Sequence, residues 1–233
     1  SRIATLIVFF VLIPLTLIVG SRLSGRAFYV TSTLVIVELL IPFFLAFEGR
    51  RPQARELVVL AVMCALAVAG RVAIPIPSFK AIFGIIMIAG IAFGPESGFL
   101  VGAISALASN FFYSQGPYTP WQMMAYGAGG MLAGFVFAEG RLPRKPVVMG
   151  IFGFLAVAFF VGPLLDTCSV FLVMSRISLK GAMAFYISGF PVNLRQAVAT
   201  AIVLLVLGKP LLEKLDRIKT KYGILDDEGR KEA

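Results

Sequence analysis

The chain has 233 residues, of which 59% are hydrophobic and 14% are charged, and its formal net charge is +9. A soluble domain has roughly 45–50% apolar and about 25% charged residues, so the composition predicts an integral membrane protein. The absence of histidine excludes metal sites and catalysis that depend on imidazole. The positive charge is typical of lysines and arginines gathered at cytoplasmic helix ends, and it does not require a nucleic acid partner.

Eight hydrophobic segments follow one another, and each is a candidate transmembrane helix because about 20 apolar residues cross the hydrocarbon core. They lie at residues 3–21, 28–47, 56–74, 80–94, 97–114, 121–138, 147–174 and 182–208. Segments 80–94 and 97–114 are short, and they are expected to be tilted, or one of them is expected to fall short of spanning. Gly162-Pro163 is expected to kink or divide segment 147–174. The predicted fold class is therefore an all-α integral membrane bundle.

Three regions are expected in this bundle. A basic stretch near residue 50 separates two additional N-terminal transmembrane helices, residues 1–48, from a six-helix core, residues 49–208. Residues 209–233 form a charged tail that is expected to contain a short helix. Most lysines and arginines fall on the side of the two termini, so both termini are predicted to be cytoplasmic. The loops at 75–80, 114–120 and 175–181 are then external.

Small residues recur every fourth position in two places. Ala61, Ala65 and Ala69 form one stripe, along which another helix can approach closely, and such contacts are a main source of helix association in lipid. This alanine stripe either packs inside the bundle or docks another membrane subunit. A glycine series with the same spacing indicates internal packing instead: Gly90, Gly94, Gly98 and Gly102, with the pair Gly130 and Gly134.

The uncharged segment 110–121 combines aromatic and amide side chains. Aromatic residues are ordinary at a membrane boundary, but a pocket for a small organic molecule also needs a few placed polar groups. The segment is therefore either an interfacial belt or a belt with a ligand-binding loop. Asp166 and Arg195 lie inside predicted spans and either form an ion pair or line a polar site. The candidate substrate-binding residues are Pro77, Lys80, Asn110, Phe112, Tyr113, Gln115, Tyr118, Trp121, Gln122, Asn193 and Arg195.

Motifs for energy conversion and catalysis are missing. No G-x-x-x-x-G-K-S/T loop occurs, so the chain is not expected to bind ATP in the usual way. The predicted spans contain no catalytic or metal-binding constellation, so no enzyme activity, metal site or bound cofactor is expected.

Over residues 56–208 the chain resembles the substrate-binding S components of energy-coupling factor (ECF) vitamin transporters. The resemblance is carried by the alanine stripe, by the run Phe93-Gly-Pro-Glu-Ser-Gly-Phe-Leu-Val-Gly102, by segment 110–121, and by Met131-Leu-Ala-Gly-Phe135. It implies a multi-pass protein of the bacterial plasma membrane. It also implies two kinds of partner, a transmembrane scaffold subunit that contacts Ala61, Ala65 and Ala69, and two cytoplasmic ATPases. The two N-terminal helices depart from the six spans usual in such proteins.

The resemblance implies that the six-helix core binds a vitamin, and overall likeness favours cobalamin. The amides and aromatic residues of the external loops suit a large, partly apolar ligand with amide groups. Biotin, pantothenate, riboflavin and a queuosine precursor remain alternatives. A stand-alone secondary permease and a structural subunit are the other two classes of function that the sequence leaves open.

Overall fold

The computed structural model describes residues 11–12, 15–16, 27–49, 53–174 and 178–223, and every longer regular element within these ranges is helical. The all-α prediction is thus confirmed. The α-helices are α3 (Ala27–Gly49), α4 (Ala54–Val72), α5 (Ile82–Phe93), α6 (Pro95–Tyr113), α7 (Thr119–Phe137), α8 (Pro146–Ala156), α9 (Gly162–Val173), α10 (Leu179–Val203) and α11 (Lys209–Tyr222). Three shorter turns connect some of them: η2 (Ala138–Gly140), η3 (Val157–Val161) and η4 (Leu204–Gly208). Most of the predicted segment 3–21 lies outside the described residues.

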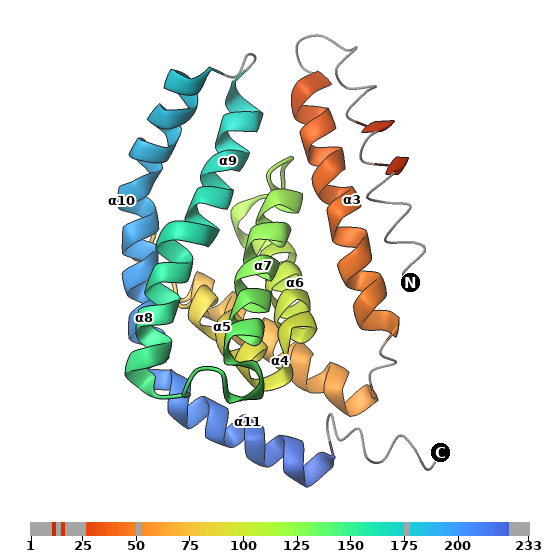
Figure 1. Cartoon of the computed structure of the whole chain (residues 1–233), viewed down its shortest axis with the longest axis vertical. Coiled ribbons are helices and arrows are strands. Elements are labelled where there is room, and N and C mark those ends of the chain that lie inside the picture. Colours follow the sequence, from red (N-terminus) through yellow and green to blue (C-terminus); the bar gives the residue numbers. More distant parts are fainter. Residues whose placement is uncertain (1–10, 13–14, 17–26, 50–52, 175–177, 224–233) are drawn as a thin grey trace.

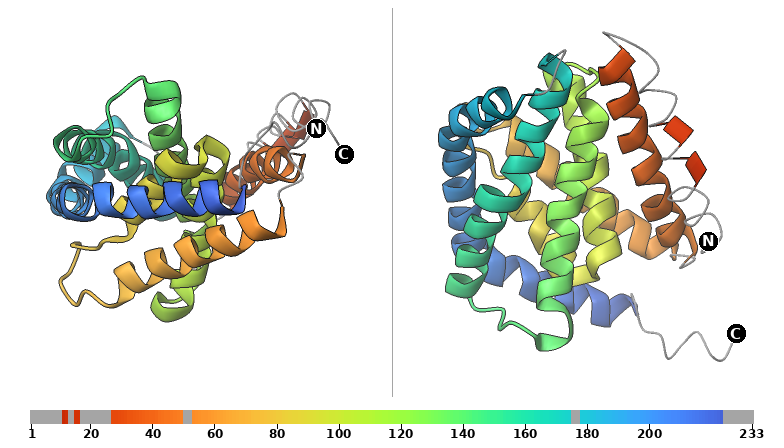
Figure 2. Two further views of the ribbon diagram at one scale, coloured as in Figure 1. Left: turned by 90° about the horizontal axis from the view of Figure 1, so that it is seen from below. Right: turned by 45° about the horizontal axis from the view of Figure 1, so that its top comes forward.

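The helices surround a central group formed by α5, α6 and α7. Figure 1 shows α3 on one side of this group, α8, α9 and α10 on the other, and α11 crossing the lower end. The two further views agree with this arrangement (Figure 2). We call the end that carries α11 the lower end, and the end with the α6–α7 and α9–α10 connections the upper end.

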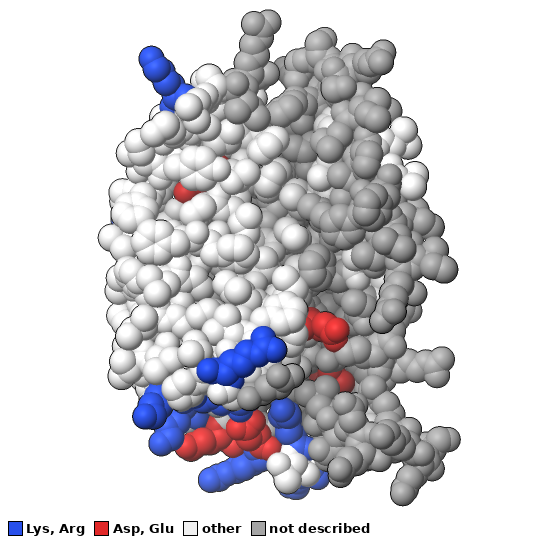
Figure 3. All heavy atoms as spheres, in the orientation of Figure 1, with Lys and Arg blue, Asp and Glu red and all other residues white. Residues whose placement is uncertain are grey.

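Two continuous helical stretches, Pro146–Val173 and Leu179–Tyr222, are long and apolar enough to cross a membrane by length and composition. Side chains on the face shown in Figure 3 are mostly uncharged above the lower end, where basic and acidic residues gather. With 12 residues, α5 is about 18 Å long, which is less than the roughly 30 Å of a hydrocarbon core. All its residues are buried, so α5 forms the centre of the bundle. That the chain crosses the membrane eight times remains a prediction.

The glycine series brings α5, α6 and α7 into backbone contact, as its spacing predicts. A Cβ atom added at Gly90 or at Gly98 would collide with the carbonyl oxygen of Gly130. A Cβ atom at Gly134 would collide with the backbone of Pro95, where α6 begins. Because no side chain separates the helices at these points, dispersion contacts between backbones hold the group together.

Both long helical stretches contain a π-helical turn. Residues Val157–Val161 form one directly before Gly162-Pro163, and residues Leu204–Gly208 form the other shortly before Pro210. Proline has no backbone N–H and its ring crowds the preceding turn, so a wider turn at this point relieves the clash. The predicted disturbance at Gly162-Pro163 is therefore a π turn, and the chain continues as a helix beyond it.

Cationic side chains fasten the lower end to the last turn of α5. Arg144 donates a hydrogen bond to the carbonyl oxygen of Ile91 (3.2 Å) and lies 3.4 Å from the carboxylate of Asp216 on α11. Lys219 of α11 donates to the carbonyl oxygen of Ala92 (2.7 Å). Since the final carbonyl groups of a helix lack partners within it, these cations satisfy the end of α5.

Substituting a glycine of the central group tests this packing. We expect Gly98→Val to lower the free energy of unfolding by about 1–3 kcal/mol, because the added side chain must push α6 away from α7. Thermal unfolding in detergent, followed by circular dichroism, measures the effect. Ala69→Val is the matched control, since Ala69 is exposed on α4. Equal melting temperatures for the two variants would contradict the packing that we describe.

Candidate functional site

A buried polar cluster at the upper end is centred on Asn110. Arg71 donates to the Oδ1 atom of Asn110 (2.9 Å) and to the hydroxyl of Ser109. The Nδ2 group of Asn110 donates to Thr119 Oγ1 (3.2 Å) and to Gln122 Oε1 (2.8 Å). Asn110 is completely buried, so these bonds replace the water that the amide loses. The cluster ties together the upper ends of α4, α6 and α7.

The connection between α6 and α7 is held by its own side chains. Gln115 donates to the carbonyl oxygen of Leu107 (2.9 Å) and accepts a hydrogen bond from Thr119 Oγ1 (2.9 Å). The hydroxyl of Tyr118 donates to the carbonyl oxygen of Ser114 (2.9 Å). Ser114 itself has φ +83°, a region that residues other than glycine rarely adopt. The connection is therefore a defined turn with stored backbone strain.

Tyr113 joins the α4–α5 connection to this cluster. Its hydroxyl donates to the carbonyl oxygen of Arg71 (3.0 Å), and the Arg71 guanidinium carbon lies 4.9 Å from its ring centroid. The Lys80 ammonium lies 6.0 Å from the same centroid and donates to the carbonyl oxygen of Ile74. Gln196 of α10 donates to the carbonyl oxygen of Lys80 (2.7 Å). Lys80 therefore lies between the polar cluster and α10.

A second polar group links α9 and α10. Asn193 donates to the carboxylate of Asp166 (2.7 Å), so of the two alternatives for Asp166 and Arg195 the ion pair does not form. Residues two apart on a helix point to nearly opposite sides. Asn193 is buried toward α9, whereas Arg195 is exposed and donates to the carbonyl oxygen of Pro191 in its own helix (3.3 Å). Among the described residues, no group of three or more Cys, Asp or Glu could hold a metal ion.

Trp121, in the first turn of α7, packs against α3 and α9. It is 8% exposed and packs against Ile36 and Cys168. Its ring stacks on that of Phe171, with centroids 5.4 Å apart. The indole N–H is buried and has no hydrogen-bond partner in the described structure. Since a buried Trp usually finds a partner for this group, the indole N–H is a donor that the described part of the protein leaves unused.

The remaining predicted residues differ in their placement. Phe112 is 68% exposed and Pro77 is also exposed, and the structure brings neither of them into the polar groups. Sequence reasoning missed Arg71 and Phe171. The signal for Arg71 was an arginine in the last turn of a helix, one residue before its end and at the level of the polar loops.

The alanine stripe lies on the exposed side of α4. Ala61, Ala65 and Ala69 are all exposed, whereas Leu60 and Met63 on the other side are buried. No described helix of this chain covers the stripe. Within the part of the chain that the structure describes, the stripe is thus an uncovered face of small side chains.

Comparison with known proteins identifies the family. A family model described as the ECF-type riboflavin transporter, S component, matches residues 52–213. This range is more than half of the chain, so the chain belongs to that family. It is thus the substrate-binding subunit of an ECF transporter for a vitamin, a membrane protein whose relatives work with a transmembrane scaffold and ATPases. No curated protein and no solved structure matches it.

Removing the central amide tests the polar cluster. We expect Asn110→Leu to lower the free energy of unfolding by about 1–3 kcal/mol, because Arg71 and Gln122 then lose a buried partner. Thermal unfolding monitored by circular dichroism gives the change. The adjacent exposed residue supplies the control, Phe111→Leu, which should unfold close to the parent temperature. If both variants unfold alike, Asn110 does not hold the three helices together.

Proposed function

We propose that the chain is the riboflavin-binding S component of an ECF importer. The observation that carries the proposal is the match of residues 52–213 to a family described by riboflavin transport. The polar and aromatic groups at the upper end support it. Riboflavin joins a flat aromatic ring system, which has both hydrogen-bond donors and acceptors, to a chain of hydroxyl groups.

The proposed binding region lies between α7, α9 and α10. Phe171, which is only half-buried and stacks on Trp121, offers an aromatic surface for the flavin ring, and the ligand would have to open this packing to accept a hydrogen bond from the buried indole N–H. The Asp166 carboxylate supplies hydrogen-bond acceptors and Asn193 supplies an amide, and both could bond to the imide edge of the flavin ring or to the hydroxyl groups of riboflavin. In contrast, Asn110 already uses both ends of its amide within the protein. We therefore assign Asn110 the role of holding the loop rather than of touching the ligand.

Cobalamin, the ligand that the sequence favours, remains an alternative prediction. It is a much larger molecule, edged by amide groups, and it would have to contact the loops at 73–80 and 114–118 as well as the helices. The two ligands would therefore contact different residues at the upper end, and comparing the binding of riboflavin with that of cobalamin distinguishes them.

Equilibrium titration of purified protein tests the ligand. We expect riboflavin to bind tightly and its fluorescence to be quenched when it is bound, with cobalamin unable to displace it. Trp121→Phe keeps an aromatic ring at this position but removes the indole N–H, and we expect it to weaken riboflavin binding by about tenfold, the cost of one buried hydrogen bond. Phe112→Leu, at an exposed position, is the control. Tight binding of cobalamin without binding of riboflavin would contradict our assignment.

We further propose that the alanine stripe docks the scaffold subunit. The exposed faces of α4 between Val58 and Ala69 carry small and aliphatic side chains, which suit close contact with another helix in lipid. Because the chain shows no nucleotide-binding loop, this contact would couple it to the ATPases. Docking along the alanine stripe does not depend on which vitamin the chain binds.

A bulky substitution separates docking from ligand binding. We expect Ala65→Trp to reduce vitamin uptake by cells at least tenfold and to leave the affinity of the purified protein unchanged, because Trp blocks helix approach without reaching the upper end. Ile151→Trp, exposed on α8, is the matched control and should transport normally. Loss of binding together with uptake would contradict docking. Uptake that persists without any ATPase partner would instead favour a stand-alone permease.

A further inference from the structure

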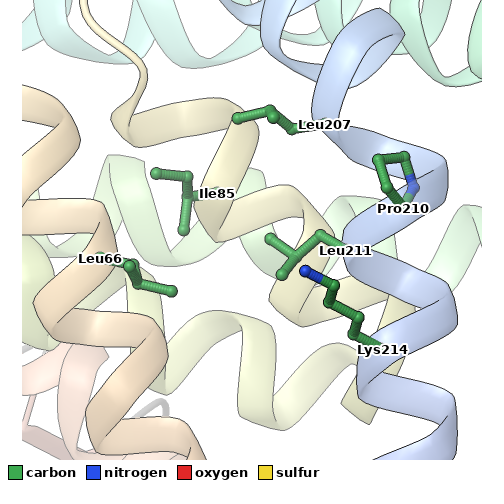
Figure 4. Close-up of a pocket in the computed structure, with 6 residues that line it drawn as sticks. All are labelled: Leu66, Ile85, Leu207, Pro210, Leu211 and Lys214. Atoms are coloured by element: carbon green, nitrogen blue, oxygen red, sulfur yellow. The ribbon is translucent and has the colours of Figure 1, made fainter.

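A groove opens on the lower half of the molecule, between α4, α5 and the junction of η4 with α11. Its cavity volume is about 260 Å³. Five of its six lining residues are apolar, and Figure 4 shows them with the sixth, a lysine, at the α11 side: Leu66, Ile85, Leu207, Pro210, Leu211 and Lys214. The groove contains none of the polar side chains of the upper end, and of its lining residues only Leu66 belongs to the α4 face proposed for docking.

Lys214 differs from Lys209 and Lys219 of α11 in its surroundings. Lys209 lies 3.9 Å from Glu213, and Lys219 donates to a backbone carbonyl of α5. Among the described residues, no acceptor lies within hydrogen-bonding or salt-bridge distance of Lys214. Figure 4 shows its side chain beside Leu211 at the groove. The groove therefore has a cation at one end and hydrocarbon along the rest.

The position of α11 sets the depth of the groove in the membrane. Leu212 and Leu215 on one side of α11 are buried, and charged residues cover its exposed side. A helix of this kind lies along the boundary between headgroups and acyl chains. Lys214 is then at the level of the lipid phosphates, and Leu66 and Ile85 lie deeper, at the level of the acyl chains.

We propose that this groove binds one acidic phospholipid. The Lys214 ammonium pairs with the headgroup phosphate, and an acyl chain fills the space between Leu66, Ile85 and Leu207. The arrangement of a cation at one end and hydrocarbon along the rest favours a lipid over a protein helix. One turn of an α-helix about 10 Å wide and 5.4 Å long fills roughly 400 Å³, so a helix could place only side chains in the groove. The lipid would lie directly beside the alanine stripe, because Leu66 follows Ala65.

Lipid retention by the purified full-length chain tests the proposal. The protein is reconstituted with phosphatidylglycerol and phosphatidylcholine carrying identical acyl chains, and native mass spectrometry counts the lipids that stay bound. We expect one phosphatidylglycerol to be retained preferentially. Lys214→Gln should weaken that retention roughly fivefold, the factor expected for one lysine at an anionic surface. Lys209→Gln, the matched control on the same helix, should change it little.

A second variant tests whether an acyl chain occupies the groove. Leu66→Trp fills the groove without changing any charge, and we expect it to abolish the tightly retained lipid. Equal retention of the two lipids would overturn the proposal, as would equal effects of Lys214→Gln and Lys209→Gln. Unchanged lipid retention in Leu66→Trp would also overturn it. Loss of uptake in Lys214→Gln with unaltered lipid retention would assign the groove to a protein partner instead.

Discussion

Backbone contact among α5, α6 and α7 is the constraint on which the rest of the structure depends. Gly90, Gly98 and Gly130 leave no room for a Cβ atom between these helices. In lipid, burial of apolar side chains removes no water, so such close contacts must supply much of the association energy. With α5 enclosed on all sides, the outer helices α3, α4 and α8–α10 are free to present specialised surfaces.

The upper and lower ends solve the problem of unsatisfied polar groups differently. At the upper end, side chains bond to each other around Asn110, and this network fixes the loops that border the proposed ligand region. At the lower end, Arg144 and Lys219 satisfy the last carbonyl groups of α5. The structure thus has a rigid centre, a polar network at the upper end and cation–carbonyl contacts at the lower end. This arrangement suits a subunit that binds a ligand at one end and obtains energy from partner subunits.

Composition and the spacing of small residues predicted the all-α fold, the internal glycine packing and a stripe on α4 that could serve docking. The disturbed helix at Gly162-Pro163 was also predictable, because proline imposes it locally. The pairing of Asp166 was not, since the angular positions of Asn193 and Arg195 depend on how α10 faces α9. The residue types of segment 110–121 indicated polar groups for ligand binding, but its amide side chains mostly form hydrogen bonds within the protein. Its composition alone therefore could not distinguish one vitamin from another.

The two π-helical turns have a consequence for the angular phase of the long helices. Each turn accommodates an extra residue, so everything after it is rotated by about 100° relative to an uninterrupted α-helix. A helical wheel drawn straight through 146–173 or 179–222 would thus assign the wrong faces to one half. In the second helix this rotation sets which side of α11 carries Leu212 and which carries Lys214. Pro210 and the π turn before it therefore set the rotational orientation of α11 about its own axis.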